Sequence, residues 1–511
     1  MKQCSLVTLA LLAVGLAPLL PSTAAAAWPT DPLVNVPLCT ATGDQDYPTI
    51  VADGAGGTIV TWEDYRSGNW DIFAQKISAG GTVQWTANGV ALCTADDYQV
   101  NPTIVADGAG GAIVIWSDTR NYSTDIYAQK ISAGGTVQWT ADGVALYTAT
   151  NSPNVIPTIV SDGAGGAIVT WQDYRSGNWD IFAQKISAGG AVQWTPNGVA
   201  LCTASGEQML PAIVADGAGG AIVTWQDFRS GVTTDIYAQE ISAGGTPQWA
   251  ADGVPLCTAS GEQYNPTIAS DGAGGAIVAW YDNRSGNSDI YAQRISAAGA
   301  FQWTANGVAL CTASGEQVLP KIVSDGASGA IVTWTDARSG DGYHDIYAQR
   351  ISAGGTVQWT AEGVALCTAT GHQWYPTIVA DGAGGAIVTW PDYRSGNYDI
   401  YAQRIQANGQ LGPIDDVPGE ASLTFALDPV RPNPTRGSAL TVRFSLPSAA
   451  AASLELLDVA GRRIATREVG SLGAGRHALN LGEGSRLAPG LYLVRLTKGA
   501  NTRTTRVAVL K

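Results

Sequence analysis

The stretch Pro102-Thr-Ile-Val-Ala-Asp-Gly-Ala-Gly-Gly-Ala-Ile-Val-Ile-Trp116 contains two short β-branched segments joined by a glycine-rich turn. A polar loop leads to a third segment, Asp125-Ile-Tyr-Ala-Gln-Lys-Ile131. The turn Ser132-Ala-Gly-Gly135 then leads to a fourth, Thr136-Val-Gln-Trp139. Short extended segments bounded by glycine turns are typical of antiparallel strands. The unit therefore predicts a small four-stranded sheet.

This unit occurs seven times. The tryptophan of its second segment recurs 54 to 56 residues apart as Trp62, Trp116, Trp171, Trp225, Trp280, Trp334 and Trp390. Four strands in a repeat of this length are typical of a propeller blade, whereas solenoid coils are usually shorter. Apolar residues on both strand faces, as in Ala112-Ile-Val-Ile-Trp116, fit strands covered by neighbouring blades. We expect an all-β protein with a seven-bladed β-propeller over residues 28–413.

The two ends of the repeat region complement each other. After Ile405 the seventh unit lacks the Gly-Val-Ala-Leu-Cys-Thr-Ala segment that closes the other units. A matching piece, Val36-Pro-Leu-Cys-Thr-Ala41, precedes the first unit. We therefore predict that the N-terminal segment completes the last blade and closes the ring.

The chain begins with features of an export signal. Lys2 precedes an apolar run from Leu6 to Leu20, and Ala24-Ala-Ala-Ala27 offers a small-residue cleavage site. Residues 1–27 therefore predict a secretory signal peptide. The rest of the sequence has no apolar run long enough to predict a membrane span.

The cysteines and the charge narrow the classes of function. Six of the seven cysteines occupy one repeat position, where the third unit has Tyr147, so buried free thiols are expected rather than a disulfide framework. Net charge is −15, with about +8 in residues 423–511 and about −23 elsewhere. An acidic propeller is unsuited to binding nucleic acid, because such binding requires clustered Lys and Arg side chains.

A different pattern follows residues 414–422, which we interpret as a linker. It contains Pro432-Asn-Pro-Thr-Arg-Gly437, Leu457-Asp-Val-Ala-Gly-Arg462 and Pro489-Gly-Leu-Tyr-Leu-Val-Arg-Leu496. Alternating strands over residues 423–511 predict an immunoglobulin-like β-sandwich. These motifs resemble the C-terminal sorting domain of type IX secretion cargo and the related flagellar hook-capping immunoglobulin-like domain. The resemblance implies export by a type IX-like route to the outer cell surface or the medium, with the secretion machinery as partner. The N-terminal repeats resemble propeller repeats of exported bacterial proteins of uncertain function.

An Asp-x-Arg motif followed by another Asp occurs in every unit, as in Asp64, Arg66 and Asp71, or Asp392, Arg394 and Asp399. A catalytic constellation occurs once in a protein, so a sevenfold motif is interpreted as a loop-fixing network of ion pairs and turns. Calcium binding and ligand contact are the alternatives left open, although Arg between carboxylates disfavours a cation. The three histidines do not form a metal-ligand pattern, and no metal or cofactor is expected.

The loop before the first strand of each unit breaks the symmetry. Its two variable positions carry aromatic residues in some units, giving the candidate ligand-binding residues Tyr47, Tyr264, Trp374 and Tyr375. In an up-and-down blade these loops share one rim with the Asp-x-Arg loops. Such residues either bind a ligand or cap the central channel.

The leading interpretation is a non-enzymatic extracellular binding or adhesion propeller, with a glycan or a protein as ligand. One alternative is a glycan-active hydrolase of sialidase-like propeller shape, and another is a purely structural envelope protein. Paired carboxylates for glycoside hydrolysis can be drawn from so many Asp that the sequence singles out no pair.

Overall fold

The computed structural model describes residues 36–148, 155–412 and 425–510, the last range with gaps at 428–429, 431–432, 434, 437–439, 447–450, 471–474, 482–486 and 500. The predicted signal peptide and linker lie outside the described residues. Residues 1–412 and 413–511 form two compact units. Within the described residues both units are built from β-strands and contain no α-helix. No helix long and apolar enough to cross a membrane occurs in these ranges.

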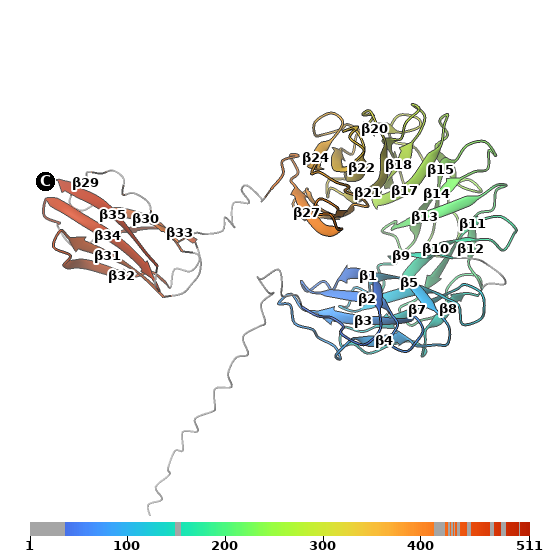
Figure 1. The fold of residues 1–511 in the computed structure, drawn as a ribbon, viewed down its shortest axis with the longest axis horizontal. Helices are drawn as coiled ribbons and strands as arrows, with labels where there is room; N and C mark the ends of the chain where they lie inside the picture. The colour runs from blue at the N-terminus through green and yellow to red at the C-terminus, as the bar shows by residue number, and fades with distance from the viewer. Residues whose placement is uncertain are drawn as a thin grey trace, which may run out of the picture. The chain divides into compact units, whose positions relative to one another are not determined.

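The first unit consists of seven antiparallel sheets that follow one another along the chain (Figure 1). The first sheet contains β1 (Gln45–Ala52), β2 (Thr58–Asp64), β3 (Asp71–Ile77) and β4 (Val90–Cys93). The second contains β5 (Gln99–Ala106), β6 (Ala112–Asp118), β7 (Asp125–Ile131) and β8 (Val144–Tyr147). The third contains β9 (Thr158–Ser161), β10 (Ala167–Asp173), β11 (Asp180–Ile186) and β12 (Val199–Cys202). Sheets four and five contain β13 (Gln208–Ala215), β14 (Ala221–Asp227), β15 (Asp235–Ile241), β16 (Val254–Cys257); and β17 (Gln263–Ser270), β18 (Ala276–Asp282), β19 (Asp289–Ile295), β20 (Val308–Cys311). Sheets six and seven contain β21 (Gln317–Ser324), β22 (Ala330–Asp336), β23 (Asp345–Ile351), β24 (Val364–Cys367); and β25 (Thr377–Ala380), β26 (Ala386–Asp392), β27 (Asp399–Ile405).

The hydrophobic cores lie between consecutive sheets. Ile59 and Cys93 of the first sheet, for example, pack with Val114 and Trp116 of the second. Trp116 is fully buried. Gly143 lies against this indole with φ +92°, and a Cβ there would come within 2.7 Å of Trp116 Cη2. Burial of both strand faces therefore follows the apolar pattern of the repeat.

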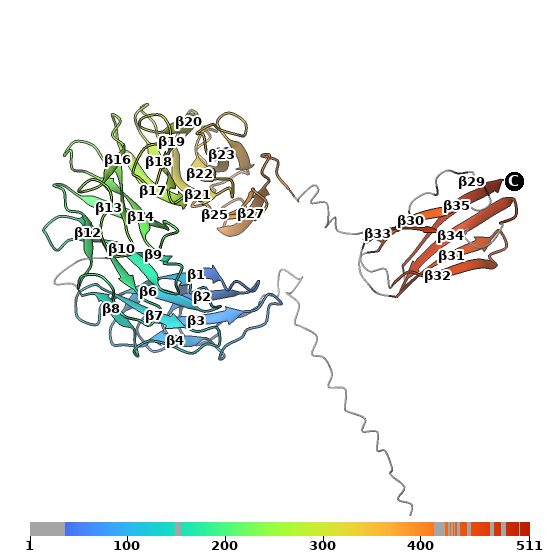
Figure 2. The ribbon, with the colours of Figure 1, turned by 180° about the vertical axis from the view of Figure 1, so that it is seen from behind.

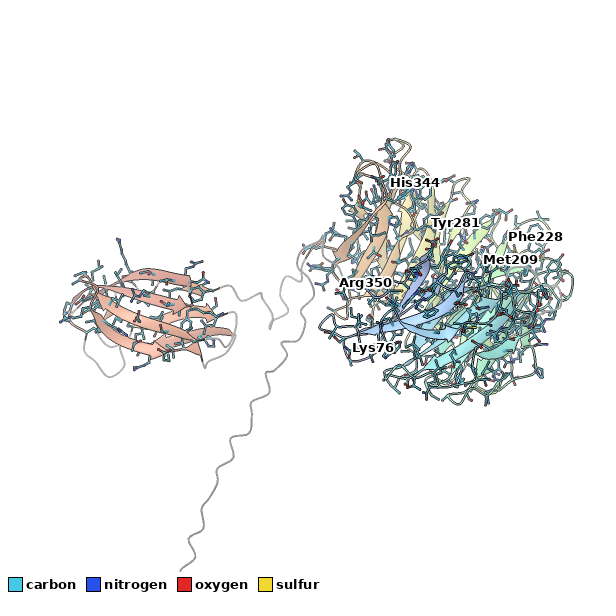
Figure 3. All side chains as sticks on the ribbon, turned by 60° about the horizontal axis from the view of Figure 1, so that its bottom comes forward. Lys76, Met209, Phe228, Tyr281, His344 and Arg350 are labelled. Carbon is cyan, nitrogen blue, oxygen red and sulfur yellow. The ribbon has the colours of Figure 1, made fainter. Side chains whose placement is uncertain are left out.

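The register puts the two kinds of turn at opposite ends of each sheet. In the first sheet Gln45 pairs with Asp64 and Asp64 with Asp71, whereas Ala52 pairs with Thr58 and Thr58 with Ile77. The variable loops and Asp-x-Arg loops thus share one rim, here called the variable rim, and the glycine turns form the other. Figure 3 shows His344, which precedes β23, and Arg350, near the end of β23, at opposite ends of this strand.

A buried aspartate at the variable rim joins several elements in every sheet. In the fifth sheet Asp282 accepts hydrogen bonds from Trp280 Nε1 at 2.9 Å and from Arg284 Nε at 2.8 Å. Arg284 Nη2 also donates to Asn306 O at 2.9 Å and to Cys257 Sγ of the preceding sheet at 3.1 Å. The guanidinium lies 3.9 Å from the Tyr291 ring centroid. We call this arrangement the Trp-Asp-Arg clamp.

The clamp explains why the cysteines occupy one repeat position. The six described cysteines are free, and four of them are buried. Burial raises the pKa of Cys257 to about 12, so the thiol stays protonated. In the third sheet Arg175 instead lies over Tyr147, 4.8 Å from its ring centroid. Position 147 is therefore a packing position that accepts either side chain.

The run of sheets is open between the first and the seventh, as Figures 1 and 2 both show. The seventh sheet has three strands, and its Ile400 is 75% exposed, whereas Ile126 at the same repeat position is fully buried. Residues 36–41 form no strand here, but Leu38 and Cys39 pack against Trp62 of the first sheet. Arg66 Nη2 donates to Cys39 Sγ at 3.2 Å, as Arg120 does to Cys93. The predicted pairing of this segment with the seventh sheet stays a prediction.

The second unit contains two sheets around one core that includes Val442, Leu454 and Val494. The three-stranded sheet comprises β28 (Ala426–Leu427), β30 (Thr441–Leu446) and β33 (Gly475–Asn480). The five-stranded sheet comprises β29 (Thr435–Arg436), β35 (Asn501–Leu510), β34 (Gly490–Lys498), β31 (Ala452–Asp458) and β32 (Arg463–Glu468).

The sequence motifs of the second unit have structural roles. Asn433 exchanges hydrogen bonds with β35, donating from Nδ2 to Arg506 O and accepting at Oδ1 from Ala508 N. Asp458 Oδ1 accepts from the backbone N–H groups of Ala460 and Arg462 and so closes the turn after β31.

Replacing Arg284 by Met should lower the free energy of unfolding by about 3 kcal/mol, because Asp282 would be left buried without its cation. The matched control, Arg462→Met, removes an exposed ion pair and should have a much smaller effect, because solvent screens the two charges. Chemical denaturation measures both, and equal effects would contradict a structural role for the clamp.

Candidate functional site

The variable loops, which precede the first strand of each sheet, form bulges in five of the seven sheets. In the first sheet the register shifts between Asp46 and Thr49, and the second variable residue, Tyr47, has φ +47°. The equivalent residues Asn101, Leu210, Asn265, Leu319 and Tyr375 also have φ between +46° and +56°. Bulky residues rarely adopt this conformation outside functional or tightly constrained sites. In six of the seven sheets this conformation thus holds one side chain of the variable loop at the variable rim.

The second variable residues of sheets three to seven line a cavity of about 370 Å³ between the first strands of these sheets. Its wall includes Ile156, Leu210, Asn265, Leu319 and Tyr375, together with the adjacent prolines and Lys321. We call it the channel cavity. Of the candidate ligand-binding residues, Tyr375 belongs to this wall and is 64% exposed. Tyr47 occupies the equivalent bulge of the first sheet and is also exposed.

The other two candidates lie in different surroundings. Tyr264 is half-buried and packs on Tyr281 of the fifth sheet, with ring centroids 5.3 Å apart. Trp374 stacks against His344 at 3.9 Å and lies 6.1 Å from Tyr375. The structure thus brings Trp374 and Tyr375 together, and Tyr264 forms a separate pair with Tyr281.

Two histidines meet beside Trp374. His344 Nδ1 and His372 Nδ1 are 3.3 Å apart, and Tyr343 packs edge-on against His372. Burial, and next the charge of His372, lowers the pKa of His344. A cavity of about 690 Å³ lined by His372, Trp374 and Tyr398 adjoins this cluster. In the described residues no group of three metal-ligating side chains occurs.

One pair of carboxylates occurs in a single sheet. Asp46 of β1 and Glu63 of β2 are cross-strand partners, so their Cβ atoms are about 5 Å apart. Burial raises the pKa of Glu63, and the charge of Asp46 raises it further, while the hydrogen bond from Asn101 N opposes both. Asp46 is exposed on the rim next to Tyr47.

Aligning the seven units in the sequence shows that an acidic residue at either of these two positions occurs in the first unit alone. The residues equivalent to Glu63 are Ser117, Gln172, Gln226, Tyr281, Thr335 and Pro391, and none of them is acidic. The equivalents of Asp46 are Val100, Val155, Met209, Tyr264, Val318 and Trp374. Only the strand register shows that the two exceptional positions face each other.

The predicted loop-fixing residues lie in the clamps of sheets one and seven. Arg66 Nε donates to Asp64 at 2.7 Å, and Arg394 Nε donates to Asp392 at 2.9 Å. Burial opposes ionisation of Asp392, but hydrogen bonds from Arg394 and Trp390 hold its pKa well below the usual range.

The second aspartate of each motif has another partner. Asp71 and Asp399 accept from Ser67 and Ser395 at 2.6 Å each. The loop-fixing role of all six residues stays a prediction that substitution can test.

Comparisons with known proteins give one family match. Residues 430–510 match the secretion system C-terminal sorting domain. The protein is therefore an exported one, directed to the medium or the cell surface. Comparison with curated proteins gives no match.

Several solved structures have a similar strand arrangement. An ulvan lyase is 10% identical, with 75% of this chain and 96% of that chain covered at a TM-score of 0.44. A Penicillium chrysogenum α-L-arabinanase is 13% identical, with 71% and 93% covered at 0.37. An endo-arabinase from Bacteroides thetaiotaomicron is 15% identical, with 60% and 93% covered at 0.31.

These comparisons correct the prediction of a non-enzymatic binding or adhesion propeller, because the similar structures named are enzymes that act on glycans. At such identities no residue role transfers, so roles must come from this chain's own geometry.

The clamp loops give a pH-dependent prediction. Burial, and next the charge of Asp227, raises the pKa of Asp235 to about 6. Because the pKa is raised, ionisation of Asp235 destabilises the fold: the loss of stability begins as the pH rises through the unfolded pKa of about 4 and is complete above about pH 6. Asp235→Asn should therefore raise Tm at pH 7.5 and raise it much less at pH 4.

The matched control is Asp125→Asn in the second sheet, because Asn121 and Ser123 both donate to the Asp125 carboxylate. This substitution should give no gain at pH 7.5. A gain at pH 4 as large as that at pH 7.5 in Asp235→Asn would refute the titration of this carboxyl as the cause.

Proposed function

We propose that this exported protein is a glycan-active hydrolase whose paired carboxylates are Asp46 and Glu63. The observation that carries the proposal is the cross-strand pairing of these two residues in only one of seven near-identical sheets. A scaffold requirement would recur in every sheet, as the clamp does. A pair that occurs once matches the single occurrence expected of a catalytic centre.

The two carboxyl groups lie in environments suited to different roles. Glu63 is only 3% exposed, and its Oε1 accepts from Asn101 N at 2.7 Å, which fixes the group. Because burial raises its pKa, Glu63 retains its proton to higher pH and can protonate the glycosidic oxygen as the bond to the anomeric carbon breaks. Asp46, exposed on the rim, can accept a proton from the attacking water or attack the anomeric carbon itself.

Aromatic side chains near this pair support a sugar ligand. Tyr47 directly follows Asp46, and Trp374 and Tyr375 lie at the same repeat positions in the seventh sheet. Aromatic faces pack on the apolar faces of sugar rings. Closure of the ring would make the first and seventh sheets neighbours and bring these residues to one site.

Closure as a seven-bladed propeller is part of the proposal. The segment Val36-Pro-Leu-Cys39 is identical to Val254-Pro-Leu-Cys257, which forms the fourth strand of the fourth sheet. Leu38 and Cys39 of this segment pack against the first sheet, in the same way as Leu92 and Cys93 of β4 pack against the second sheet. Pairing this segment with β27 would bury Ile387 and Ile400, which are 39% and 75% exposed. We further propose that the C-terminal sandwich is immunoglobulin-like and serves a type IX-like route.

Glu63→Gln should lower hydrolysis of the preferred polysaccharide by about 100-fold or more, because Gln cannot donate the acid proton. The fold should be kept, since Gln172 and Gln226 accept the equivalent backbone hydrogen bond in other sheets. Asp46→Val, the residue of the second and third units, should be similarly inactive.

The measurement is release of reducing ends from arabinan, dextran and polygalacturonate. Arg467→Gln, on the second unit, serves as the active control. Full activity in Glu63→Gln, or no activity of the wild type on a broad polysaccharide panel, would refute the proposal.

The closed ring predicts a specific cross-link. Tyr237 pairs with Pro255 in the fourth sheet, so Pro37 should pair with Tyr401. The double variant Pro37→Cys/Tyr401→Cys should form an intramolecular disulfide on mild oxidation, because paired strand positions place Cα atoms within about 6 Å. Mass spectrometry of non-reduced peptides checks this. The mismatched pair Pro37→Cys/Tyr347→Cys should stay reduced, and equal cross-linking of both pairs would contradict the register.

A further inference from the structure

Lys321 is unlike the other cations of the first unit. Every other Lys and Arg in residues 36–148 and 155–412 forms an ion pair with an aspartate. Within the same ranges no ion pair of Lys321 is found. The other cations neutralise aspartates of the fold, and Lys321 does not. Its ammonium group therefore needs a different explanation.

The position of Lys321 breaks the repeat. The equivalent residues are Thr49, Thr103, Thr158, Ala212, Thr267 and Thr377, so the fold tolerates a small side chain here. Lys321 lies on β21, the innermost strand of its sheet, and pairs with Thr333 of β22. The sheet therefore does not require the Lys side chain, which lines the channel cavity instead.

The surroundings of Lys321 suit an anion. It lines the channel cavity together with Thr158, Asn265, Thr267 and Tyr375, and the described wall contains no acidic residue. The side chain is open to the channel, but the surrounding protein lowers the pKa of its ammonium. Removal from bulk water makes an unpaired charge costly, and an incoming anion would relieve that cost.

We propose that the channel cavity binds the carboxylate or sulfate group of an acidic glycan through Lys321 Nζ. The hydroxyl and amide groups of Thr158, Thr267 and Asn265 supply neutral hydrogen bonds, and Tyr375 packs on a sugar ring at the mouth of the cavity. The inference rests on the proposed function in taking a glycan as the ligand, and it names the class of glycan. Charge-assisted contacts in a partly dry site are stronger than those on an open surface.

The test measures binding by isothermal titration calorimetry in the Glu63→Gln background, which prevents turnover. The probes are polygalacturonate for carboxylate, dextran sulfate for sulfate, and dextran as the neutral polymer. At least one acidic polymer should bind more tightly than dextran. Lys321→Thr, which restores the common residue of the repeat, should weaken that binding about tenfold or more.

Two control variants separate local recognition from net charge. Lys321→Arg keeps the cation and should stay within about threefold of the parent, because both side chains pair with carboxylate and sulfate. Arg467→Gln removes one positive charge from the second unit and should leave binding unchanged. The polymer whose binding depends on Lys321 identifies carboxylate or sulfate as the recognised group.

The outcomes distinguish this inference from the proposed function. Failure of both acidic polymers to bind, or unchanged binding in Lys321→Thr, overturns the anion site even if neutral glycans are cleaved. Binding that depends on Lys321 in a protein that cleaves no glycan supports the anion site and overturns the hydrolase. A loss in Arg467→Gln equal to that in Lys321→Thr also overturns the site, because it would reflect net charge alone.

Discussion

The ion pair between a fully buried aspartate and an arginine at the end of each second strand is the constraint on which the first unit depends. In the fifth sheet Asp282 is shielded from solvent, so its charge is tolerable only with Trp280 and Arg284 bonded to it. The same guanidinium reaches Cys257 of the preceding sheet. One interaction thus fixes a loop, orients the core tryptophan and holds two sheets in register.

Because the clamp and the cores between sheets supply the scaffold, single positions on the variable rim are free to differ. In six of the seven sheets the second variable residue has a left-handed conformation, whatever its type. Carboxylates at positions 46 and 63 and an ammonium at position 321 can therefore be introduced one at a time without altering the neighbouring sheets. Function in such a repeat protein lies in the departures from the repeat.

At the opposite rim, ion pairs and hydrogen bonds hold the glycine turns of neighbouring sheets together. There Asp107 accepts from the backbone N–H groups of Ala109 and Gly111 and pairs with Lys130, whose ammonium also donates to Gly165 O of the next sheet. Lys76 and Lys185 make the same link between other sheets. All of these cations are neutralised, and this regularity is what makes the unpaired Lys321 informative.

The sequence alone determined three of the four strands of each unit, the repeat, the rim on which variable residues gather and the export domain, because strand period, glycine turns and short motifs are local properties of the chain. It placed the fourth strand wrongly, at Thr136–Trp139, whereas that strand is β8 (Val144–Tyr147) and Val137 makes only an isolated bridge to Ile131. It also indicated that the shared cysteine position is a packing site. Only the tertiary structure decided which variable residues meet. Cross-strand register joins Asp46 to Glu63, and packing between sheets six and seven joins His344 to Trp374. These contacts link residues separated by 17 and 30 positions, and they arise from pairing and packing between segments, which no local pattern encodes.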